Sequence, residues 1–467
     1  MTKILFINPP LTQKERYGVK QKAGGQTPPT GLVLLATIMK NKGYDVELID
    51  MCVENKIIPK CDYLCITSST LAIYHAKDVA EIAKHFYPNV KIILGGAHIT
   101  AVPIETIERL GKFFDYAVLG EGDETLPELI DCLEKNGNVS EVKGICFTKG
   151  DSMLTFTTPR PMYQNLDNLP IPDWNLLPDL AKNYSPPAHT VKKFPAALLV
   201  CSRGCFGQCT FCDKKVFGSR IRSYSSDYIF NMIMDLKNNY GIKEIQFRDD
   251  NLLIFKNTVK ELCNRLINEK INLTFSCTAR VDIVDEKYLK LLKKAGCYQI
   301  WYGIESGSDR ILKVIKKNTT VEQIRKAITL TKKCGISPCG FFIIGHPTET
   351  EDDIKATIKL ILELPLDEFH WGHMTPFPGC ELYKTALQYG SFNNDWKKMN
   401  GWNVLFITKE LTHDKLVYYC NLAFRKFYFR PRIIFNYMLK LRSWHNIKVY
   451  FTALIGLLML TSMKKRD

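Results

Sequence analysis

The sequence lacks the signatures of several protein classes. It has no low-complexity tract and no internal repeat at solenoid periods, which excludes a disordered chain and a repeat array. No signal peptide precedes its 16 cysteines, so we expect a reducing, cytoplasmic compartment rather than a disulfide scaffold. An apolar run over residues 449–463 is shorter than the roughly 20 residues that span a bilayer.

The chain also lacks a basic stripe of the kind that binds nucleic acid. Its formal net charge is +15, but lysine and arginine are spread along the chain and not gathered with interleaved aromatic residues. Solvated helix faces account for most of this charge outside the C-terminus. We therefore expect no nucleic-acid partner.

The length of 467 residues predicts more than one domain, each large enough for its own core. Strand and helix patterns alternate over residues 1–136 and again over 196–390. The intervening residues 137–195 are rich in proline and asparagine, which predicts a linker that wraps the surface. We expect residues 391–467 to form a helical C-terminal region.

Three closely spaced cysteines are the strongest chemical signal in the chain. Cys205, Cys209 and Cys212 form a CxxxCxxC run that follows an apolar strand pattern over residues 196–200. Thiolates at this spacing can bind three irons of a [4Fe–4S] cube and leave the fourth iron open for a small molecule. The run therefore predicts an iron–sulfur site at the carboxyl end of a strand.

A zinc site is the main alternative for these cysteines. Zinc requires a fourth ligand at a matched spacing, and no second CxxC or HxxxH lies nearby. Cys201 could supply a fourth thiolate, although we expect it to end the strand. The spacing favours the cluster over zinc and over simple packing.

The first alternating region predicts a doubly wound, Rossmann-like parallel sheet of five strands. Small or glycine-rich loops follow several of these strands, and such loops let a ligand approach the backbone, although plain tight turns explain them equally well. The expected strands are residues 3–7, 45–49, 63–67, 91–94 and 116–119.

The second alternating region predicts a partial (β/α)6 barrel that is open on one side. Polar residues follow its strands at the edge where parallel barrels bind their ligands, which favours a polar ligand site over isolated helix caps. These residues are Asp249, Asp250, Arg280, Glu305, Ser306 and Glu349.

The cysteine run and the strands after it resemble the core of the radical S-adenosylmethionine (radical SAM) superfamily. The resemblance implies that Asp249 and Asp250 bind the amino group of S-adenosylmethionine and that Arg280 meets its carboxylate. It places Glu305 and Ser306 at the ribose-facing strand end.

The adenine-facing strand matches the family pattern only in part. Gly345 and Ile343 fit the GxIxG motif of the superfamily, whereas Phe341 replaces its leading glycine. The resemblance therefore assigns Gly345 to the adenine side of the site.

The first region resembles the cobalamin-binding domains that precede some radical SAM cores, in the class of the anaerobic magnesium-protoporphyrin ester cyclase. No DxHxxG motif occurs, which implies that cobalt has no protein histidine on its lower face. We read His98 as a pocket residue. The resemblance implies a cobalamin site formed by Asn8, Pro9, Ser68, Ser69, Thr70, Gly95, Gly96, His98, Gly120 and Glu121.

The combined resemblance implies a cobalamin-dependent radical SAM enzyme. Reductive cleavage of S-adenosylmethionine yields a 5′-deoxyadenosyl radical that takes hydrogen from an unactivated carbon, followed by methylation, cyclisation or rearrangement. The expected substrate is a small or lipid-like molecule, and the expected electron donor is a flavodoxin or ferredoxin. A methylthiotransferase is one alternative, although Cys52, Cys61 and Cys65 crowd one segment. A cofactor-binding sensor without turnover is another.

Basic and aromatic residues interleave from Phe424 to Trp444, ahead of the apolar run over residues 449–463. This pattern is typical of helices that lie in the headgroup plane of a membrane. It equally suits helices that pack on the barrel and close its open side. The first interpretation predicts peripheral contact with the inner face of the membrane.

Overall fold

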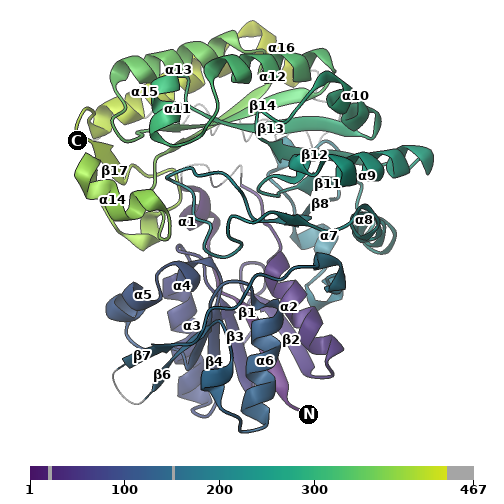
Figure 1. Ribbon diagram of the computed structural model, residues 1–467, viewed down its shortest axis with the longest axis vertical. Coiled ribbons are helices and arrows are strands. Elements are labelled where there is room, and N and C mark those ends of the chain that lie inside the picture. The colour runs from purple at the N-terminus through teal and green to yellow at the C-terminus, as the bar shows by residue number, and fades with distance from the viewer. Residues whose placement is uncertain (19–20, 22–23, 150–152, 439–467) are drawn as a thin grey trace.

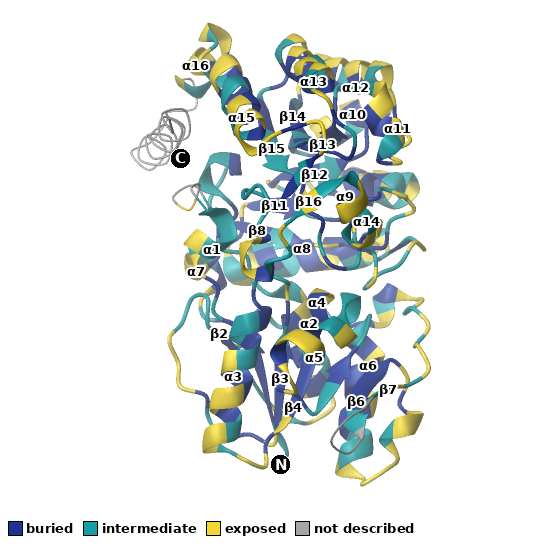
Figure 2. Ribbon diagram, turned by 90° about the vertical axis from the view of Figure 1, so that its left-hand side faces the viewer, coloured by how far each residue is buried: buried dark blue, intermediate teal, exposed yellow. Residues whose placement is uncertain are grey.

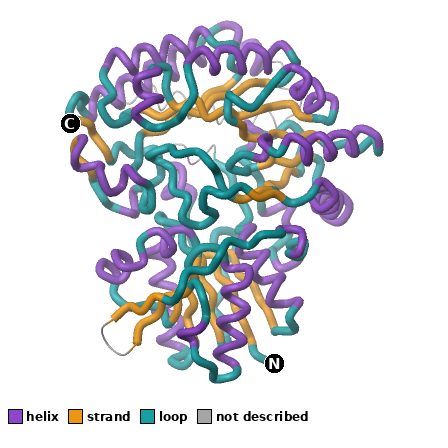
Figure 3. Tube along the Cα trace, viewed as in Figure 1, coloured by secondary structure: helices purple, strands orange, loops and turns teal. Residues whose placement is uncertain are grey.

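The computed structural model describes residues 1–18, 21, 24–149 and 153–438. A sheet near the N-terminus and a curved half barrel lie one above the other in Figure 1, and the loops that follow their strands meet between them (Figure 3). Buried residues fill both sheets (Figure 2).

Within the described residues, the N-terminal sheet has seven strands in the order β2-β1-β3-β4-β5-β6-β7. The first five are parallel, as predicted, and their order is that of a doubly wound, flavodoxin-like sheet. They are β1 (Lys3–Asn8), β2 (Asp45–Asp50), β3 (Tyr63–Thr67), β4 (Lys91–Gly95) and β5 (Tyr116–Val118).

Helices cover both faces of this sheet because side chains alternate along each strand. Ile4 and Phe6 pack in one core with α2 (Thr30–Asn41) and α6 (Gly122–Glu134). Leu5 and Ile7 pack in the other core, and the helices on that face are α3 (Ile73–Phe86), α4 (Ala97–Ala101) and α5 (Pro103–Leu110).

Two strands extend the sheet into the predicted linker, so the N-terminal unit ends later than residue 136. β6 (Ile145–Lys149) and β7 (Met153–Phe156) pair antiparallel beyond β5. Ile145 and Cys146 are buried in different cores, on opposite faces of the strand. From residue 157 to 195 the chain is a connector with short helical turns and α7 (Leu180–Asn183).

The half barrel has six parallel strands in the described part of the chain, in the order β15-β14-β13-β12-β11-β8, which confirms the predicted architecture. The strands are β8 (Ala196–Leu199), β11 (Glu244–Phe247), β12 (Thr274–Ala279), β13 (Cys297–Glu305), β14 (Ser337–Ile344) and β15 (Glu368–His373). The helices between them are α8 (Ser226–Tyr240), α9 (Lys256–Asn268), α10 (Glu286–Lys294), α11 (Asp309–Val314), α12 (Val321–Lys333) and α13 (Glu351–Glu363).

Side-chain caps fix where these helices begin. The predicted caps are present: Asp285 accepts a hydrogen bond from the amide of Tyr288, and Thr320 forms a capping box with Gln323. The loops that carry the polar residues therefore end at defined points, where the next helix begins.

The C-terminal region is only partly helical, because residues 390–408 hold an antiparallel pair, β16 (Gly390–Phe392) and β17 (Phe406–Thr408), after α14 (Glu381–Tyr389). α15 (His413–Tyr428) then packs on α13, and Phe424 stacks on Phe369 of β15 with 4.9 Å between ring centroids. The last described helix is α16 (Pro431–Met438). Of the two interpretations of this region, packing on the barrel is the one observed up to residue 438.

No helix in the described residues is both long and apolar enough to cross a membrane. The predicted apolar segment at 449–463 lies outside the described residues, as do Lys440, Arg442 and Trp444.

Candidate cofactor site between the sheet and the half barrel

The cysteine loop leaves β8 and is tied to the next strand by Asp249. The Asp249 Oδ1 accepts hydrogen bonds from the Cys201 amide at 2.7 Å and the Ser202 hydroxyl at 2.6 Å. Cys201 lies two residues beyond the end of β8 and not at the end of the strand, where it was expected. It is fully buried, and desolvation raises the pKa of its thiol.

The loop then folds around Gly207. A Cβ built on this glycine would lie 3.4 Å from Cys205 Sγ and 3.9 Å from Cys209 Sγ, so both sulfurs face one small space. Cys212 is exposed, but partial desolvation and the nearby Cys209 and Cys205 sulfurs raise the pKa of its thiol to about 12, which favours the thiol form unless a metal binds the sulfur. The thiolates of a cube each bind a different iron, and the sulfurs of Cys205 and Cys209 face one space beside Gly207. The donor set therefore fits a cluster.

Asp249 and Asp250 differ in their surroundings. Asp249 is 3% exposed, and desolvation raises the pKa of its carboxyl to about 7. Its Oδ2 has no hydrogen-bond partner among the described residues, so one oxygen stays available. Asp250 is exposed at the rim. Asp249 thus positions the cysteine loop, in addition to its predicted role in binding S-adenosylmethionine.

Arg280 lies beside the cysteine loop, as its predicted role requires. Its Nε and Nη2 donate to Asp282 at 3.0 and 2.9 Å, and its Nη1 would lie 3.8 Å from a Cβ on Gly207. The fork toward Asp282 fixes the guanidinium plane and leaves Nη1 toward the loop. Phe206 covers the guanidinium at 5.3 Å from the ring centroid.

Glu305 ends β13 in the left-handed backbone region, with φ of 67°. Its Oε1 accepts a hydrogen bond at 2.7 Å from Lys317 Nζ, and both side chains are about 9% exposed. Burial opposes the charge of Lys317, but Glu305 beside it holds the pKa of the ammonium above its usual value. No motif marks Lys317 in the sequence; it follows α11 and precedes the next helix cap.

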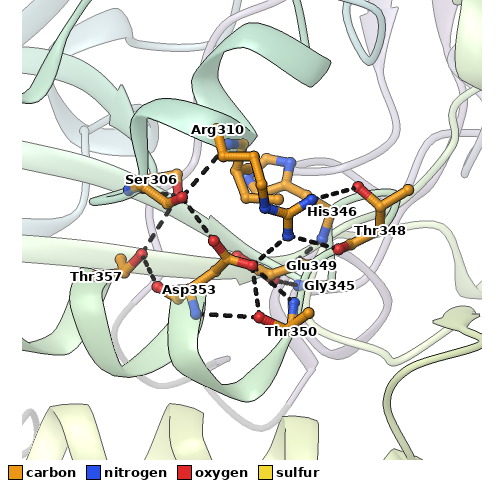
Figure 4. Close-up of polar contacts among 11 residues, drawn as sticks. Ser306, Arg310, Gly345, His346, Thr348, Glu349, Thr350, Asp353 and Thr357 are labelled. Carbon is orange, nitrogen blue, oxygen red and sulfur yellow. Dashed lines mark hydrogen bonds and ion pairs between the residues drawn. The ribbon is translucent and has the colours of Figure 1, made fainter.

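Ser306 and Gly345 belong to a polar network that joins the ends of β13 and β14 (Figure 4). The Ser306 hydroxyl lies 3.3 Å from Thr357 Oγ1. The Glu349 carboxylate accepts hydrogen bonds from the amides of Gly345 at 2.6 Å and His346 at 3.2 Å. Burial raises the pKa of Glu349 to about 8 and lowers the pKa of His346 to about 4.

In the N-terminal sheet, the predicted cobalamin residues gather at the carboxyl ends of β1, β3, β4 and β5. The strand order reverses between β1 and β3, which is where doubly wound sheets bind ligands. Gly96, with φ of 102°, approaches β3 so closely that a Cβ would lie 2.6 Å from the Ser68 carbonyl oxygen. A Cβ on Gly95 would meet no atom within 4 Å, so this strand end is open on one side.

The side chains at this edge are partly engaged within the protein. Asn8 donates to Asp50 at 2.7 Å and precedes the buried Pro9. The Ser68 hydroxyl donates to the Gly95 carbonyl at 2.8 Å, and Ser69 is exposed. The open backbone edge and the exposed hydroxyl fit a large ligand that approaches the strand ends.

His98 is buried beneath this edge, between the sheet and the C-terminal region. Its Nδ1 lies 3.2 Å from Thr70 Oγ1, and its ring meets Trp396 edge-on at 4.4 Å. Burial, with Arg109 nearby, lowers the pKa of His98 to about 3, so the ring is neutral. This placement agrees with a pocket residue and not with an exposed ligand of cobalt.

Glu121 faces the cysteine loop. It accepts from Arg222 Nη1 at 2.9 Å through each oxygen, from Arg203 at 3.2 Å and from the Tyr163 amide at 2.7 Å. These contacts occupy the lone-pair directions of the carboxylate, so Glu121 acts as an anchor. The preceding Gly120 amide donates to Thr100 Oγ1 at 3.1 Å.

Arg203 is the residue that sequence reasoning missed here. It stands two positions before Cys205, and its guanidinium binds both oxygens of Asp123, at 3.1 Å for the pair that joins Nη2 to Oδ1. Its position between β8 and Cys205 is the sequence feature that could have indicated a role at this site.

Two family profiles match separate parts of the chain. The profile of the radical SAM superfamily matches residues 199–361, and the profile of the B12 binding domain matches residues 17–130. The structure with aqua-cobalamin and S-adenosylmethionine bound of OxsB, a cobalamin-dependent S-adenosylmethionine radical enzyme, shares the fold, with a TM-score of 0.76 at 18% identity over 99% of this chain and 72% of that one.

Two relatives align over most of the chain. An uncharacterized methyltransferase of Pyrococcus horikoshii is 33% identical over 92% of this chain and 94% of its own length. The anaerobic magnesium-protoporphyrin IX monomethyl ester cyclase of Rubrivivax gelatinosus is 28% identical over 82% of this chain and 69% of its own length. The chain therefore belongs to the radical SAM superfamily, in the cobalamin-dependent class of methyltransferases and cyclases that carry a B12 binding domain ahead of the barrel.

Proposed function

We propose that this enzyme methylates an unactivated carbon of a small or lipid-like molecule. When bound, the cluster supplies the electron that cleaves S-adenosylmethionine, and cobalamin supplies a transferable methyl group. The observation that carries the proposal is the contact of Arg203 with Asp123 and Glu121, which holds the cysteine loop against the cobalamin edge of the sheet. A methyl donor and a radical source must both lie next to the substrate to act on the same molecule.

The described side chains have defined tasks in such a site. Asp249 fixes the start of the cysteine loop, and Arg280 presents Nη1 toward it for the carboxylate of S-adenosylmethionine. Buried Lys317 and Glu305 brace the neighbouring strand end.

The methylthiotransferase alternative requires a second set of cluster ligands in the N-terminal unit. Cys61 and Cys65 are 7% and 4% exposed and pack in the two cores of the sheet. The Cys52 thiol donates to the Pro9 carbonyl at 3.3 Å. The positions of these three cysteines favour a structural role, and so they favour methyl transfer over the alternative.

Anaerobic reconstitution tests the proposal. We expect protein loaded with iron, sulfide and hydroxocobalamin to release 5′-deoxyadenosine under dithionite, and a flavodoxin or ferredoxin to replace the dithionite. With S-adenosylmethionine deuterated in its methyl group, extracts of a deletion strain should yield a product heavier by the labelled methyl. Release of 5′-deoxyadenosine without label in any product would instead favour cyclisation or rearrangement.

We also propose that the C-terminal helices touch an anionic membrane surface. Phe429, Ile434, Phe435 and Met438 are exposed apolar residues, and Arg425, Lys426 and Arg432 are exposed on the same two helices. Figure 2 shows exposed residues along α15 and α16. Apolar side chains that enter the interface and cations that face acidic headgroups together support such contact.

Vesicle sedimentation checks this contact. Full-length protein should sediment with vesicles that contain phosphatidylserine, and less with neutral vesicles. Replacing Ile434 and Phe435 with serine should lower the bound fraction several-fold, because apolar burial drives insertion. Serine in place of Ile82, an exposed residue of α3, is the control. Equal sedimentation of all three proteins would contradict the proposal.

A further inference from the structure

Arg248 extends β11 on the inner side of the half barrel. The residue before it, Phe247, packs in the outer core with the helices, so its neighbours Gln246 and Arg248 point the other way. The Arg248 guanidinium donates to the side-chain oxygen of Gln246, on the same side of the strand. Gln246 in turn donates to the Thr190 carbonyl at 2.9 Å, in the segment that precedes the barrel.

Within the part of the chain that the structure describes, this guanidinium has no counter-ion. Among the described residues, no carboxylate lies within ion-pair distance of Arg248, and its charge interactions are with Tyr298, Tyr17 and two cysteine thiols, groups that are neutral at pH 7. Arg248 is half-buried, and desolvation lowers its pKa, the direction expected of a partly shielded cation that has no opposite charge beside it among the described residues.

Three other shielded arginines of the two units are matched by carboxylates, whereas Arg430 of the C-terminal region donates to backbone carbonyls instead. Arg203 pairs with Asp123, Arg222 with Glu121 and Arg280 with Asp282. A shielded charge is costly unless an opposite charge compensates it. The exception at Arg248 therefore indicates a place where a ligand supplies the negative charge.

Aromatic side chains line the same side of the neighbouring strands. Trp301 of β13 stacks on Phe341 of β14 at 4.8 Å, and Phe341 meets His370 of β15 edge-on at 6.0 Å. The register pairs Phe247 with Cys277 and Thr278 with Trp301, so Trp301 lies level with Arg248. Phe341 and His370 lie two residues further toward the carboxyl ends of the strands. The combination favours an anion attached to an apolar body.

We propose that Arg248 binds a carboxylate or phosphate group of the substrate, whose apolar part lies along Trp301, Phe341 and His370. The inference rests on the proposed function, since it assumes a substrate in the barrel. The carboxylate of S-adenosylmethionine is a second source of the same chemistry. We disfavour this second source because another arginine, Arg280, already lies beside the cysteine loop. Arg280 is two residues closer to the rim than Thr278, the residue level with Arg248.

Binding without turnover tests the proposal, so its failure is separate from a failure of the proposed reaction. The full chain, with cluster and cobalamin loaded, is titrated with phenylacetate, phenyl phosphate and neutral phenylacetamide while its melting temperature is followed. Both anions should raise the melting temperature of the wild type and the amide should not, because only a ligand that binds the folded state stabilises it. Arg248→Gln should weaken the anion response at least about tenfold, as expected for loss of a charge-assisted contact.

Three comparisons make the result decisive. Arg248→Lys should restore part of the anion response, and Arg325→Gln, at an exposed position, should respond as the wild type does. Both Arg248 variants should melt near the wild type without ligand, since no ion pair is lost. An unchanged response in Arg248→Gln, an equal response to the amide or no response in the wild type would overturn the proposal. Loss of S-adenosylmethionine affinity in Arg248→Gln would assign the anion to that cofactor and overturn the substrate assignment.

Discussion

A Cys209→Ala variant, prepared without oxygen and supplied with iron and sulfide, is expected to lose the visible absorption of a [4Fe–4S] cluster. The release of 5′-deoxyadenosine should fall below detection. Two thiolates cannot hold three irons of the cube. Removing a residue that only hydrogen-bonds to a metal ligand costs roughly 10–100-fold in metal affinity or activity, so removing the ligand itself should cost more.

Cys201→Ala is the matched control because it removes a thiol only four positions before the cluster motif. Cys201 is buried, and its hydrogen bond to Asp249 comes from the backbone, which alanine keeps. This variant should retain iron, sulfide and colour. Loss of the cluster in Cys201→Ala, or a colourless wild type that binds zinc, would point to the four-thiolate alternative.

The sequence predicted the parallel strands of both units because each is a short apolar run followed by a turn and a helix. The sequence did not predict β6 and β7, because a strand pair at the edge of a sheet depends on a distant partner. Their neighbourhood of proline and asparagine gave the stronger local signal, that of a connector. Tertiary pairing therefore overrode the local composition.

The candidate site shows a second limit of sequence reasoning. Strand ends predicted which polar residues would gather, but not which of them the protein uses for itself. The Glu121 carboxylate accepts a hydrogen bond from Arg203, which lies 82 positions later in the sequence. The His98 ring packs against the ring of Trp396, far along the chain. Such pairings arise only when two units pack together, and a single sequence gives no measure of them.

Replacing Arg203 with methionine should produce the second large effect, a fall of about 3–5 kcal/mol in the free energy of unfolding. The side chains of Arg203 and Asp123 are 9% and 5% exposed, so the substitution leaves a buried carboxylate without its partner. Urea denaturation of the apoprotein, followed by fluorescence and circular dichroism, measures the change. Arg325→Met, which breaks an exposed pair with Glu363, should change the midpoint little.

A double-mutant cycle separates the pair from other effects of the substitution. Asp123→Asn combined with Arg203→Met should be less destabilised than the sum of the two single variants, because the buried charge is gone. Additive effects would show that the two side chains do not depend on each other.

The same variant tests whether the two loops act together. Arg203 joins the cysteine loop to the strand-end edge proposed for cobalamin, whereas Asp249 and Arg280, the residues proposed to bind S-adenosylmethionine, lie within the barrel. At a temperature where Arg203→Met is folded, release of 5′-deoxyadenosine should therefore persist while transfer of the labelled methyl falls by at least about tenfold, as expected when a reacting group shifts by about 1 Å. A parallel loss of both products would mean that Arg203 serves the cluster loop alone, and the proposed coupling of the two cofactor loops would then be wrong.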